Sequence, residues 1–303
     1  MDAFFNVDKP RGPTSHDVVA RLRRASGVRR IGHAGTLDPL ATGVLVVAVG
    51  RATRLIEYVT EVDKAYLAAV TFGVQTDTYD AEGTVTARAD ESAVAALTPE
   101  RIALALAHFR GVIQQRPPAH SAISVGGKRL YALARAGQEV EAPLRQVEIT
   151  RLELRDWQPP IATLFMECSK GTYVRSLAND LGAALGTGGH LSALRRTRVG
   201  PHRIEAAVPL EILEADLRAG AWDPHAVLPE RAVEHLPALA ITAAEQTRLE
   251  HGLPVAPEAA IAQGVGTLCR ALGPDGRLIA MVRVIQHEGE RQIRPEKVLS
   301  IAA

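Results

Sequence analysis

Cysteine is nearly absent from this chain, since Cys168 and Cys269 are the only two among 303 residues. Two cysteines so far apart form neither a disulfide framework nor a metal-ligand pair, and such low usage is typical of a reducing compartment. No run of 18 apolar residues without a charge occurs, so we expect no membrane span. The N-terminus lacks the basic and apolar regions of a signal peptide. Together these absences predict a cytoplasmic protein.

Net charge is also small, at +1, but it is unevenly distributed. Residues 110–203 contain 14 Lys and Arg against 7 Asp and Glu, whereas residues 204–303 contain 9 against 14. A second basic cluster lies within Arg21–Arg30. Clustered cations are what a phosphate backbone requires, although an arginine-rich segment can equally be a solvated face. The middle of the chain is therefore a candidate for nucleic-acid binding.

Apolar patterns and turn residues predict an α+β fold with a mixed sheet. Strands and helices are interleaved, but they do not follow a strict βαβ repeat. A glycine closes the last predicted helix, and Pro99 lies near the start or at a break of another. The elements expected are helices over 15–24, 91–109 and 172–185 and strands over 43–50, 66–72 and 161–168.

The chain is expected to divide near residue 235, after an acidic stretch that contains proline. Residues 1–235 would form a large domain, and residues 236–303 a small β-rich domain with a hairpin turn at Pro274–Gly276. Glycines, prolines and cations in Gly111–Pro143 predict an exposed insertion built around a short helix, which we expect to be mobile without a partner. We find no coiled-coil pattern and expect a monomer.

Three places carry residues that suit chemistry. Asp38 is the only carboxylate of a loop over residues 32–40, although an Asp-Pro pair usually serves as a turn former. Tyr173 and Arg175 follow a glycine where a strand passes into a helix, a position that also suits surface residues. Tyr66 enters a strand, where a tyrosine is usually half-buried packing. Each residue alone therefore has an ordinary structural explanation.

Together, these residue types can fill the roles that one demanding reaction requires. Breaking a carbon–nitrogen glycosidic bond and rejoining the base through carbon needs a carboxylate at the sugar or ring, and a flat platform for the loose base. An arginine keeps a neighbouring carboxylate ionised, and an aromatic ring stacks a flipped base. Composition and spacing alone do not single out that reaction.

Six segments, in order, resemble the signature motifs of the TruB family of tRNA pseudouridine synthases. The resemblance implies a mixed-sheet catalytic domain with a thumb-like insertion, followed by a PUA-like RNA-binding domain. It implies isomerisation of uridine 55 in the T arm of tRNA, without a metal or cofactor. Tyr79 departs from the pattern, which has a small polar residue there. The matching segments are Asp8–Ser15, His33–Leu45, Thr76–Gly83, Ser121–Tyr131, Ser169–Arg175 and His190–Arg196.

The resemblance also implies roles for individual residues. Asp38 matches the catalytic aspartate, Arg175 the arginine that pairs with it, and Tyr173 a tyrosine beside the sugar. The residues implied in substrate binding are Tyr66 under the base, Leu194 in the pocket, His33 beside the disturbed bases, Lys9 behind the loop, and Lys128 and Arg129 in the insertion.

Three other functions compete with this interpretation. A non-catalytic RNA-binding or tRNA-folding protein would use the same basic middle, but it needs no carboxylate facing RNA. A nucleotide-dependent enzyme is suggested by the glycines of Gly186–His190, which lack a Gly-Lys-Ser/Thr ending. Guide-RNA-dependent pseudouridine synthases share the catalytic motifs, and only closer likeness to the stand-alone type separates them.

Replacing both Lys128 and Arg129 with Ala is expected to weaken tRNA binding. Each lost phosphate contact should flatten the negative slope of log affinity against log salt concentration by about one unit. Affinities measured over a salt series test this. An unchanged slope would place both side chains away from the RNA.

Overall fold

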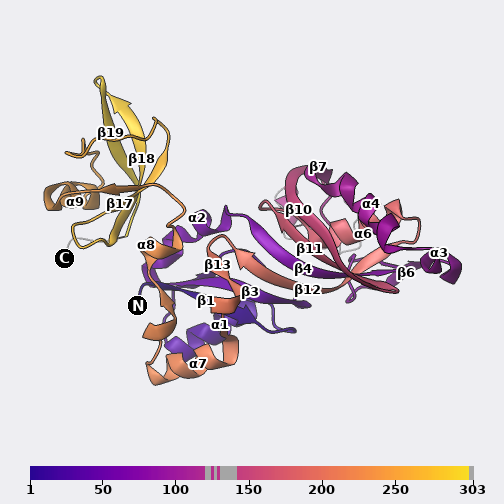
Figure 1. Ribbon diagram of the computed structural model, residues 1–303. Helices are drawn as coiled ribbons and strands as arrows, with labels where there is room; N and C mark the ends of the chain where they lie inside the picture. The colour runs from indigo at the N-terminus through magenta and orange to yellow at the C-terminus, as the bar shows by residue number, and fades with distance from the viewer. Residues whose placement is uncertain (120–123, 126–127, 130–141, 300–303) are drawn as a thin grey trace.

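The structure, a computed structural model, describes residues 1–119, 124–125, 128–129 and 142–299. One large mixed sheet forms the body of the molecule, and a four-stranded sheet follows it near the C-terminus. Figure 1 shows the smaller sheet at the end of the molecule that also holds the N-terminus, away from α3 and α4. The α+β class and the β-rich C-terminal region expected from the sequence are confirmed.

The large sheet is mixed because β3 and β12 pair in parallel while most neighbours pair antiparallel. Register pairs Ala41 with Leu194 and Gly43 with Arg196. Strands β13 (His202–Arg203), β15 (Ala226–Val227) and β2 (Ile31–His33) pair with β12, β1 and β3 beside the main path. The path runs β14 (Val208–Pro209), β1 (Ala3–Lys9), β3 (Ala41–Val49), β12 (Gly189–Val199), β4 (Lys64–Phe72), β11 (Ile161–Cys168), β10 (Arg145–Gln158) and β7 (Gly111–Gln115).

Strand β3 is buried on both faces, which explains its nearly continuous apolar sequence. Leu45 and Val47 face one core, whereas Val44 and Val46 face another. The first core is covered by α1 (Ser15–Ser26), α4 (Pro99–Leu106), α6 (Val174–Ala184) and α7 (Leu210–Ala219). The second is covered by η1 (Gly50–Leu55), α2 (Ile56–Thr60), α8 (Pro229–Ala232) and the C-terminal sheet.

The C-terminal region packs directly against the second core. Leu278, Met281 and Leu299 belong to the same buried cluster as Val46 and Tyr58. Two polar contacts join these parts as well: Arg54 Nη1 donates to the Val298 carbonyl at 2.6 Å, and Lys297 pairs with Glu57. This region consists of β16 (Ala238–Ala240), α9 (Ala243–Glu250), β17 (Leu268–Leu272), β18 (Leu278–His287) and β19 (Glu290–Val298).

Most predicted elements form, with shifted ends. Thr14 caps α1 through a capping box, and the helix runs to Ser26 because Gly27 adopts the left-handed conformation that ends it. The helix expected over 91–109 is broken before Pro99. Its pieces are α3 (Glu91–Ala95), α4 and η2 (Ala107–Phe109).

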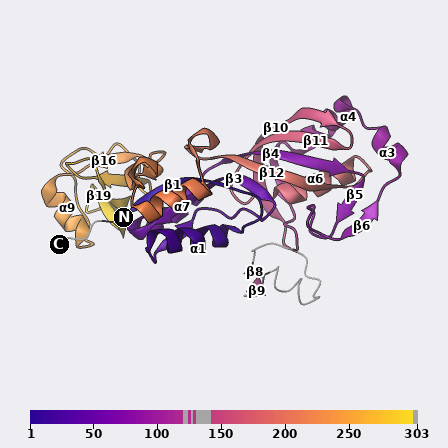
Figure 2. The same ribbon diagram turned by 90° about the horizontal axis from the view of Figure 1, so that it is seen from below.

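The expected insertion begins later than the sequence suggested. Gly111–Gln115 form β7, which pairs with β10 at the edge of the large sheet. Beyond β7, β8 (Ser124–Val125) and β9 (Lys128–Arg129) pair with each other, apart from the large sheet (Figure 2). The helix expected there lies outside the described residues.

Short elements complete the described chain. Strands β5 (Val74–Thr76) and β6 (Val85–Arg88) form a hairpin, and η3 (Ile204–Ala206) and η4 (Asp223–His225) precede β14 and β15. Within the described ranges, no helix is long and apolar enough to cross a membrane.

A bidentate ion pair fastens α1 to α7. Arg21 Nε and Nη2 donate to the two carboxylate oxygens of Glu214 at 2.9 and 2.5 Å, and the Glu214 side chain is only 7% exposed. Hydrogen bonding from Arg21 lowers the pKa of Glu214 below its ordinary value. The pair therefore stabilises the fold above the pKa of an unfolded glutamate, and this contribution is lost as pH falls through the lower folded-state pKa.

Replacing Glu214 with Gln is expected to lower the free energy of unfolding at pH 7 by about 1–2 kcal/mol, because a charge-assisted contact is lost. The deficit should shrink in acid, because the unfolded wild-type chain then gains a proton at Glu214 and the ion pair's contribution declines. Glu211→Gln is the matched control, since Glu211 lies 3.7 Å from the same arginine but is 63% exposed. Urea unfolding at pH 7 and pH 3.5 measures both; equal losses in the two variants would contradict the assignment.

Candidate active site

The loop that carries Asp38, residues 34–40, is fixed through its main chain. Lys9 is fully buried, and its Nζ donates to the carbonyls of Ala41 at 2.7 Å, Pro10 at 3.0 Å and Pro39 at 3.5 Å. Burial lowers the pKa of Lys9 to about 8, which leaves it mostly protonated at pH 7. A buried ammonium thus holds the far end of the loop.

Arg196, from β12, holds the near end of the same loop. Its guanidinium donates to the carbonyls of Val44 at 2.7 Å, Gly35 at 3.1 Å and Thr36 at 3.3 Å. Such close packing explains Gly43, which has a φ of +97° and where a Cβ would lie 2.2 Å from the Arg196 carbonyl oxygen. Between the two cations, Ser15 Oγ accepts from Leu37 N at 2.8 Å and donates to its carbonyl at 3.1 Å.

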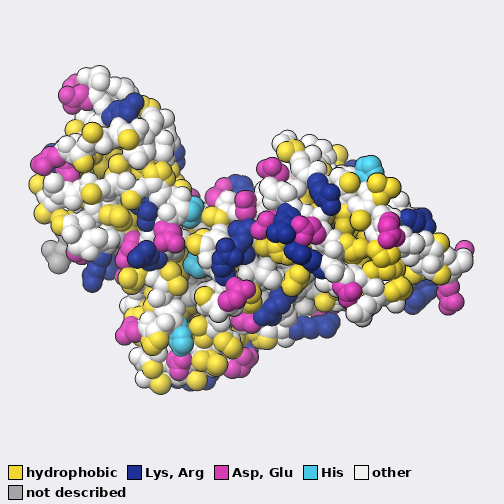
Figure 3. Space-filling view, viewed as in Figure 1, with side chains coloured by type: hydrophobic (Ala, Val, Ile, Leu, Met, Phe, Trp, Pro, Cys, Tyr) yellow, Lys and Arg dark blue, Asp and Glu magenta, His cyan; other side chains and the backbone are white. Residues whose placement is uncertain are grey.

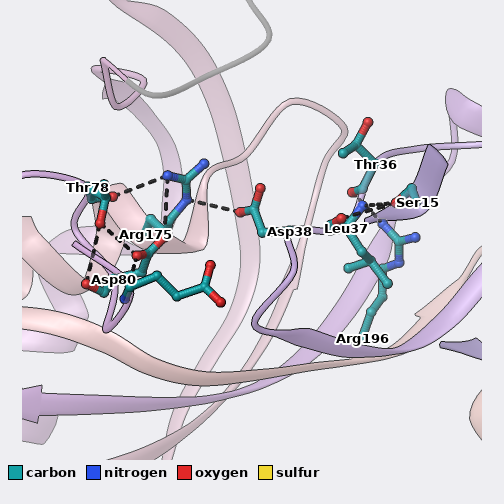
Figure 4. A network of polar contacts seen from close by, with 9 residues as sticks. Ser15, Thr36, Leu37, Asp38, Thr78, Asp80, Arg175 and Arg196 are labelled. Atoms are coloured by element: carbon teal, nitrogen blue, oxygen red, sulfur yellow. Dashed lines mark hydrogen bonds and ion pairs between the residues drawn. The ribbon is translucent and has the colours of Figure 1, made fainter. Parts of the chain in front are cut away.

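Arg175 joins Asp38 to a second carboxylate. Its Nε lies 3.0 Å from Asp38 Oδ2, and its Nη1 lies 3.5 Å from Asp80 Oδ2 and donates to the Thr78 carbonyl at 3.2 Å. Figure 4 shows Asp38 between this group and the Ser15–Arg196 side of the site. The Arg175 and Asp80 side chains are 7% and 6% exposed, whereas Asp38 is 36% exposed. Asp38 is therefore the accessible end of a buried network.

The network opens into a cavity of about 300 Å³. Asp38 and Arg175 line it together with Tyr66 from β4, Leu194 from β12 and Tyr173 at the start of α6. The structure thus brings five of the predicted residues to one place, although they come from four separate parts of the chain. The other lining residues include Gly35, Thr60, Lys64, Lys170 and Arg196.

The remaining predicted residues lie elsewhere. Lys9 lies behind the Asp38 loop, where its ammonium donates hydrogen bonds to main-chain carbonyls. His33, on β2, forms an edge-to-face contact with His16, with ring centroids 5.3 Å apart. The backbone of Lys128 and Arg129 forms β9, and the positions of their side chains are outside the described structure.

Burial also shapes the charge of the cavity wall. It raises the pKa of Tyr66, which keeps the phenol neutral at physiological pH. It lowers the pKa of Lys64 to about 8, although Lys64 Nζ still donates to the carbonyls of Thr60 and Val62. Within the described ranges, no group of three His, Cys, Asp or Glu side chains is arranged to hold a metal ion.

Sequence reasoning missed Asp80, Arg196 and Lys64 as parts of this site. Asp80 and Arg196 belong to segments that carried the family resemblance, but no signal within those segments distinguished them from their neighbours. Lys64 stands two residues before Tyr66, so the alternation of a strand could have placed both on one face.

Basic side chains gather over the middle of the large sheet, around β12 and β13 (Figure 3). Carboxylates offset part of this charge: Arg151 and Arg155 both contact Glu153, and Arg198 pairs with Glu167. Both Arg151 and Arg155 also lie over the Phe165 ring, about 5 Å from its centroid. This face is thus less positive than its arginine count suggests.

Family comparisons agree with this geometry. The model of the TruB family pseudouridylate synthase N-terminal domain matches residues 23–174, and that of the tRNA pseudouridylate synthase B C-terminal domain matches residues 175–228. The chain belongs to the TruB family. It is an isomerase that converts uridine to pseudouridine in tRNA, which rules out the nucleotide-dependent and purely RNA-binding alternatives.

Curated relatives support the same conclusion over most of the chain. The enzyme is 51% identical to tRNA pseudouridine synthase B of Symbiobacterium thermophilum over 256 residues, which are 84% of this chain and 83% of the relative. It is 44% identical to the Arthrobacter sp. protein of that name over 290 residues, or 93% and 92% of the two chains.

Solved structures extend the likeness to the whole fold. A chain from a Cbf5–Nop10–Gar1 complex matches with a TM-score of 0.78 and 28% identity, covering 99% of this enzyme and 85% of that chain. A chain from an H/ACA RNP bound to a substrate RNA containing 2'-deoxyuridine matches with a TM-score of 0.76 and 26% identity, covering 98% and 85%.

His33 is expected to stay neutral in the folded enzyme well below pH 6. Its Nδ1 is buried and has no hydrogen-bond partner among the described residues, and burial together with nearby His16 and Arg196 lowers its pKa to about 4. The unfolded chain binds a proton that the folded chain does not, so His33 makes the fold less stable as pH falls below about 6.5. Its ring resonances in an NMR titration should not move between pH 8 and pH 5, and a midpoint near that of a short peptide would refute this.

Proposed function

We propose that the enzyme modifies uridine 55 in the T arm of tRNA and that Asp38 performs the chemistry on a flipped-out base. One observation carries the assignment of Asp38: it is the exposed end of a network whose other members are buried, and it faces the cavity. A carboxylate inside a cavity reaches a uridine only when the base leaves its stack. The proposal leaves two points of attack for the Asp38 carboxylate, the uracil ring and the sugar.

Arg175 has an electrostatic role in this proposal. Asp80 and Thr78 hold its guanidinium from behind, so it presents Nε to Asp38 in a fixed direction. A charge-assisted hydrogen bond of 3.0 Å stabilises the negative charge of Asp38 and orients the carboxylate. The group as a whole carries one net negative charge, which suits a nucleophile or a base.

Tyr66 and Leu194 would hold the loose base. They lie on neighbouring strands β4 and β12 and line the same cavity as Asp38. A neutral phenol ring offers a π-face on which a uracil can stack. Tyr173 would lie beside the sugar and take part in proton transfers, with His33 next to the bases disturbed by the flip.

The rest of the chain would hold the tRNA. We assign the reaction to a catalytic domain over residues 1–235 and RNA binding to a PUA-like domain over residues 236–303. Lys128 and Arg129 would contact phosphates of the T arm. The enzyme is proposed to act as a cytoplasmic monomer, and Cys168 and Cys269, both buried and unpaired, suit that compartment.

Asp38→Asn is expected to abolish isomerisation while tRNA affinity stays within a few-fold of wild type. The amide keeps the size of the side chain but is a poor nucleophile or base, so the rate should fall by several orders of magnitude, at least roughly 4 kcal/mol in the barrier. Affinity depends mainly on phosphate contacts made elsewhere. Release of tritium from C5-labelled uridine and filter binding measure the two quantities on the same folded protein.

Asp77→Asn is the matched control. Asp77 is an exposed loop aspartate whose Oδ1 accepts from Thr84 N at 2.8 Å, so its role is to hold a turn. This variant should retain wild-type turnover. Substantial turnover by Asp38→Asn would end the assignment of Asp38, and mapping of pseudouridine to a position other than 55 would end the assignment of the target.

A further inference from the structure

Gln115 is a buried amide at the last position of β7, and it contacts the active site only through the main chain. Its side chain makes two hydrogen bonds to Tyr173: Nε2 donates to the Tyr173 carbonyl at 3.0 Å, and Oε1 accepts from Tyr173 N at 2.7 Å. The residue is 3% exposed. An amide that uses both its donor and its acceptor on one residue fixes that residue's position and its orientation.

Tyr173 is a sensitive place for such a contact. It is the N-cap of α6, with an extended backbone at φ −101° and ψ 110°, and Arg175 follows in the first helical turn. The first N–H groups of a helix have no partner within the helix, so their direction depends on contacts from outside. A second bond fastens the same turn, because Ser176 Oγ donates to the Arg116 carbonyl at 2.7 Å.

We propose that Gln115 is a positioning residue for the isomerisation, which acts by setting the start of α6 so that Tyr173 and Arg175 face Asp38 correctly. This inference rests on the proposed roles of Asp38, Tyr173 and Arg175. Loss of the amide would remove the hydrogen-bond partner of the Tyr173 N–H. The Tyr173 carbonyl would keep only the bond from Leu177 N, at 3.2 Å, so the turn would shift toward a new partner for the N–H. A shift of about 1 Å in catalytic geometry can cost about 100-fold in rate.

Gln115→Met tests the proposal, because it keeps the length of the side chain and removes both hydrogen bonds. We expect the single-turnover rate at saturating enzyme to fall by about 10- to 100-fold, while the tRNA dissociation constant stays within about threefold. Gln114→Met is the matched control. Gln114 is the neighbouring strand residue, is exposed, and points to the opposite face, so its rate should equal wild type.

Gln115→Glu supplies a second readout that a merely structural role would not produce. A protonated carboxyl both donates to the Tyr173 carbonyl and accepts from its N–H, as the amide does, whereas a carboxylate only accepts. The rate of this variant relative to wild type should therefore rise as pH falls from 8 to 5.5. Circular dichroism melts establish that both variants are folded at the assay temperature.

The outcomes separate this inference from the proposed function when Asp38→Asn is assayed beside the Gln115 variants. An inactive Asp38→Asn with wild-type rates in Gln115→Met would overturn the inference alone. Equal losses of rate and tRNA affinity in Gln115→Met, or a pH-independent ratio in Gln115→Glu, would reduce Gln115 to general support of the fold. Turnover by Asp38→Asn would instead overturn the proposed function.

Discussion

The candidate active site depends on hydrogen bonds to the carbonyl groups of one loop, several of them from buried cations. Lys9 and Arg196 donate to carbonyls at the two ends of the Asp38 loop, and Ser15 ties its middle. Main-chain nitrogens contribute as well, because Ala41 N donates to the Asp38 carbonyl at 3.0 Å and Gly12 N to the Pro39 carbonyl at 2.9 Å. Carbonyls without partners are costly, so a loop in which five successive carbonyls, those of residues 35–39, all have donors in one conformation has few alternatives. The rigidity of Asp38 therefore comes from its backbone.

In the proposed mechanism, this arrangement separates the groups that are held fixed from the carboxylate that reacts. Lys9 and Arg196, the cations that hold the loop, donate their hydrogen bonds to carbonyl groups. Arg175, which faces Asp38, is itself held by Asp80 and Thr78. Among the carboxylates of the described residues, Asp38 alone lines the cavity. Charges arranged before the substrate arrives need no reorganisation during the reaction, which is how preorganised sites lower barriers. A lysine at position 175 could not bind two carboxylates and a carbonyl in one plane, because its ammonium lacks the fork of a guanidinium.

Sequence patterns identified the elements whose apolar residues face a core. The strand over 161–168 has the predicted bounds, and α1 begins at the predicted residue, Ser15. Strand β12, at the centre of the sheet, was not predicted, because Arg195, Arg196 and Arg198 interrupt its apolar pattern. Arg196 can be buried, at 1% exposed, because main-chain carbonyls accept hydrogen bonds from its guanidinium. Every residue has such a carbonyl, so the amino-acid sequence does not show where these acceptors lie. Gln115 was not predicted for the same reason, because its partners are the main-chain N–H and carbonyl of Tyr173.

The residues of the candidate site were predicted from the resemblance to a family, and the contacts in the structure then explain why they lie together. Asp38, Tyr66, Tyr173 and Arg175 look ordinary one by one, since each suits a turn, a strand entry or a helix start. Their meeting depends on strand order, which local patterns do not determine. Asp80 could not be chosen from among the acidic residues of Thr76–Gly83, because only the fold shows which of them faces Arg175.

The parallel pairing of β3 with β12 has a consequence for how the enzyme is made. It joins segments about 150 residues apart in the chain, as the contact between Arg196 and the Val44 carbonyl does. Closing so long a loop is slow and gains little until both strands are in place. On the ribosome, an emerging chain can form α1 and the antiparallel pair of β1 and β3 early, but the Asp38 loop acquires its Arg196 contacts only after β12 has been synthesised. A chain in which β12 has not yet been synthesised therefore has no complete Asp38 site.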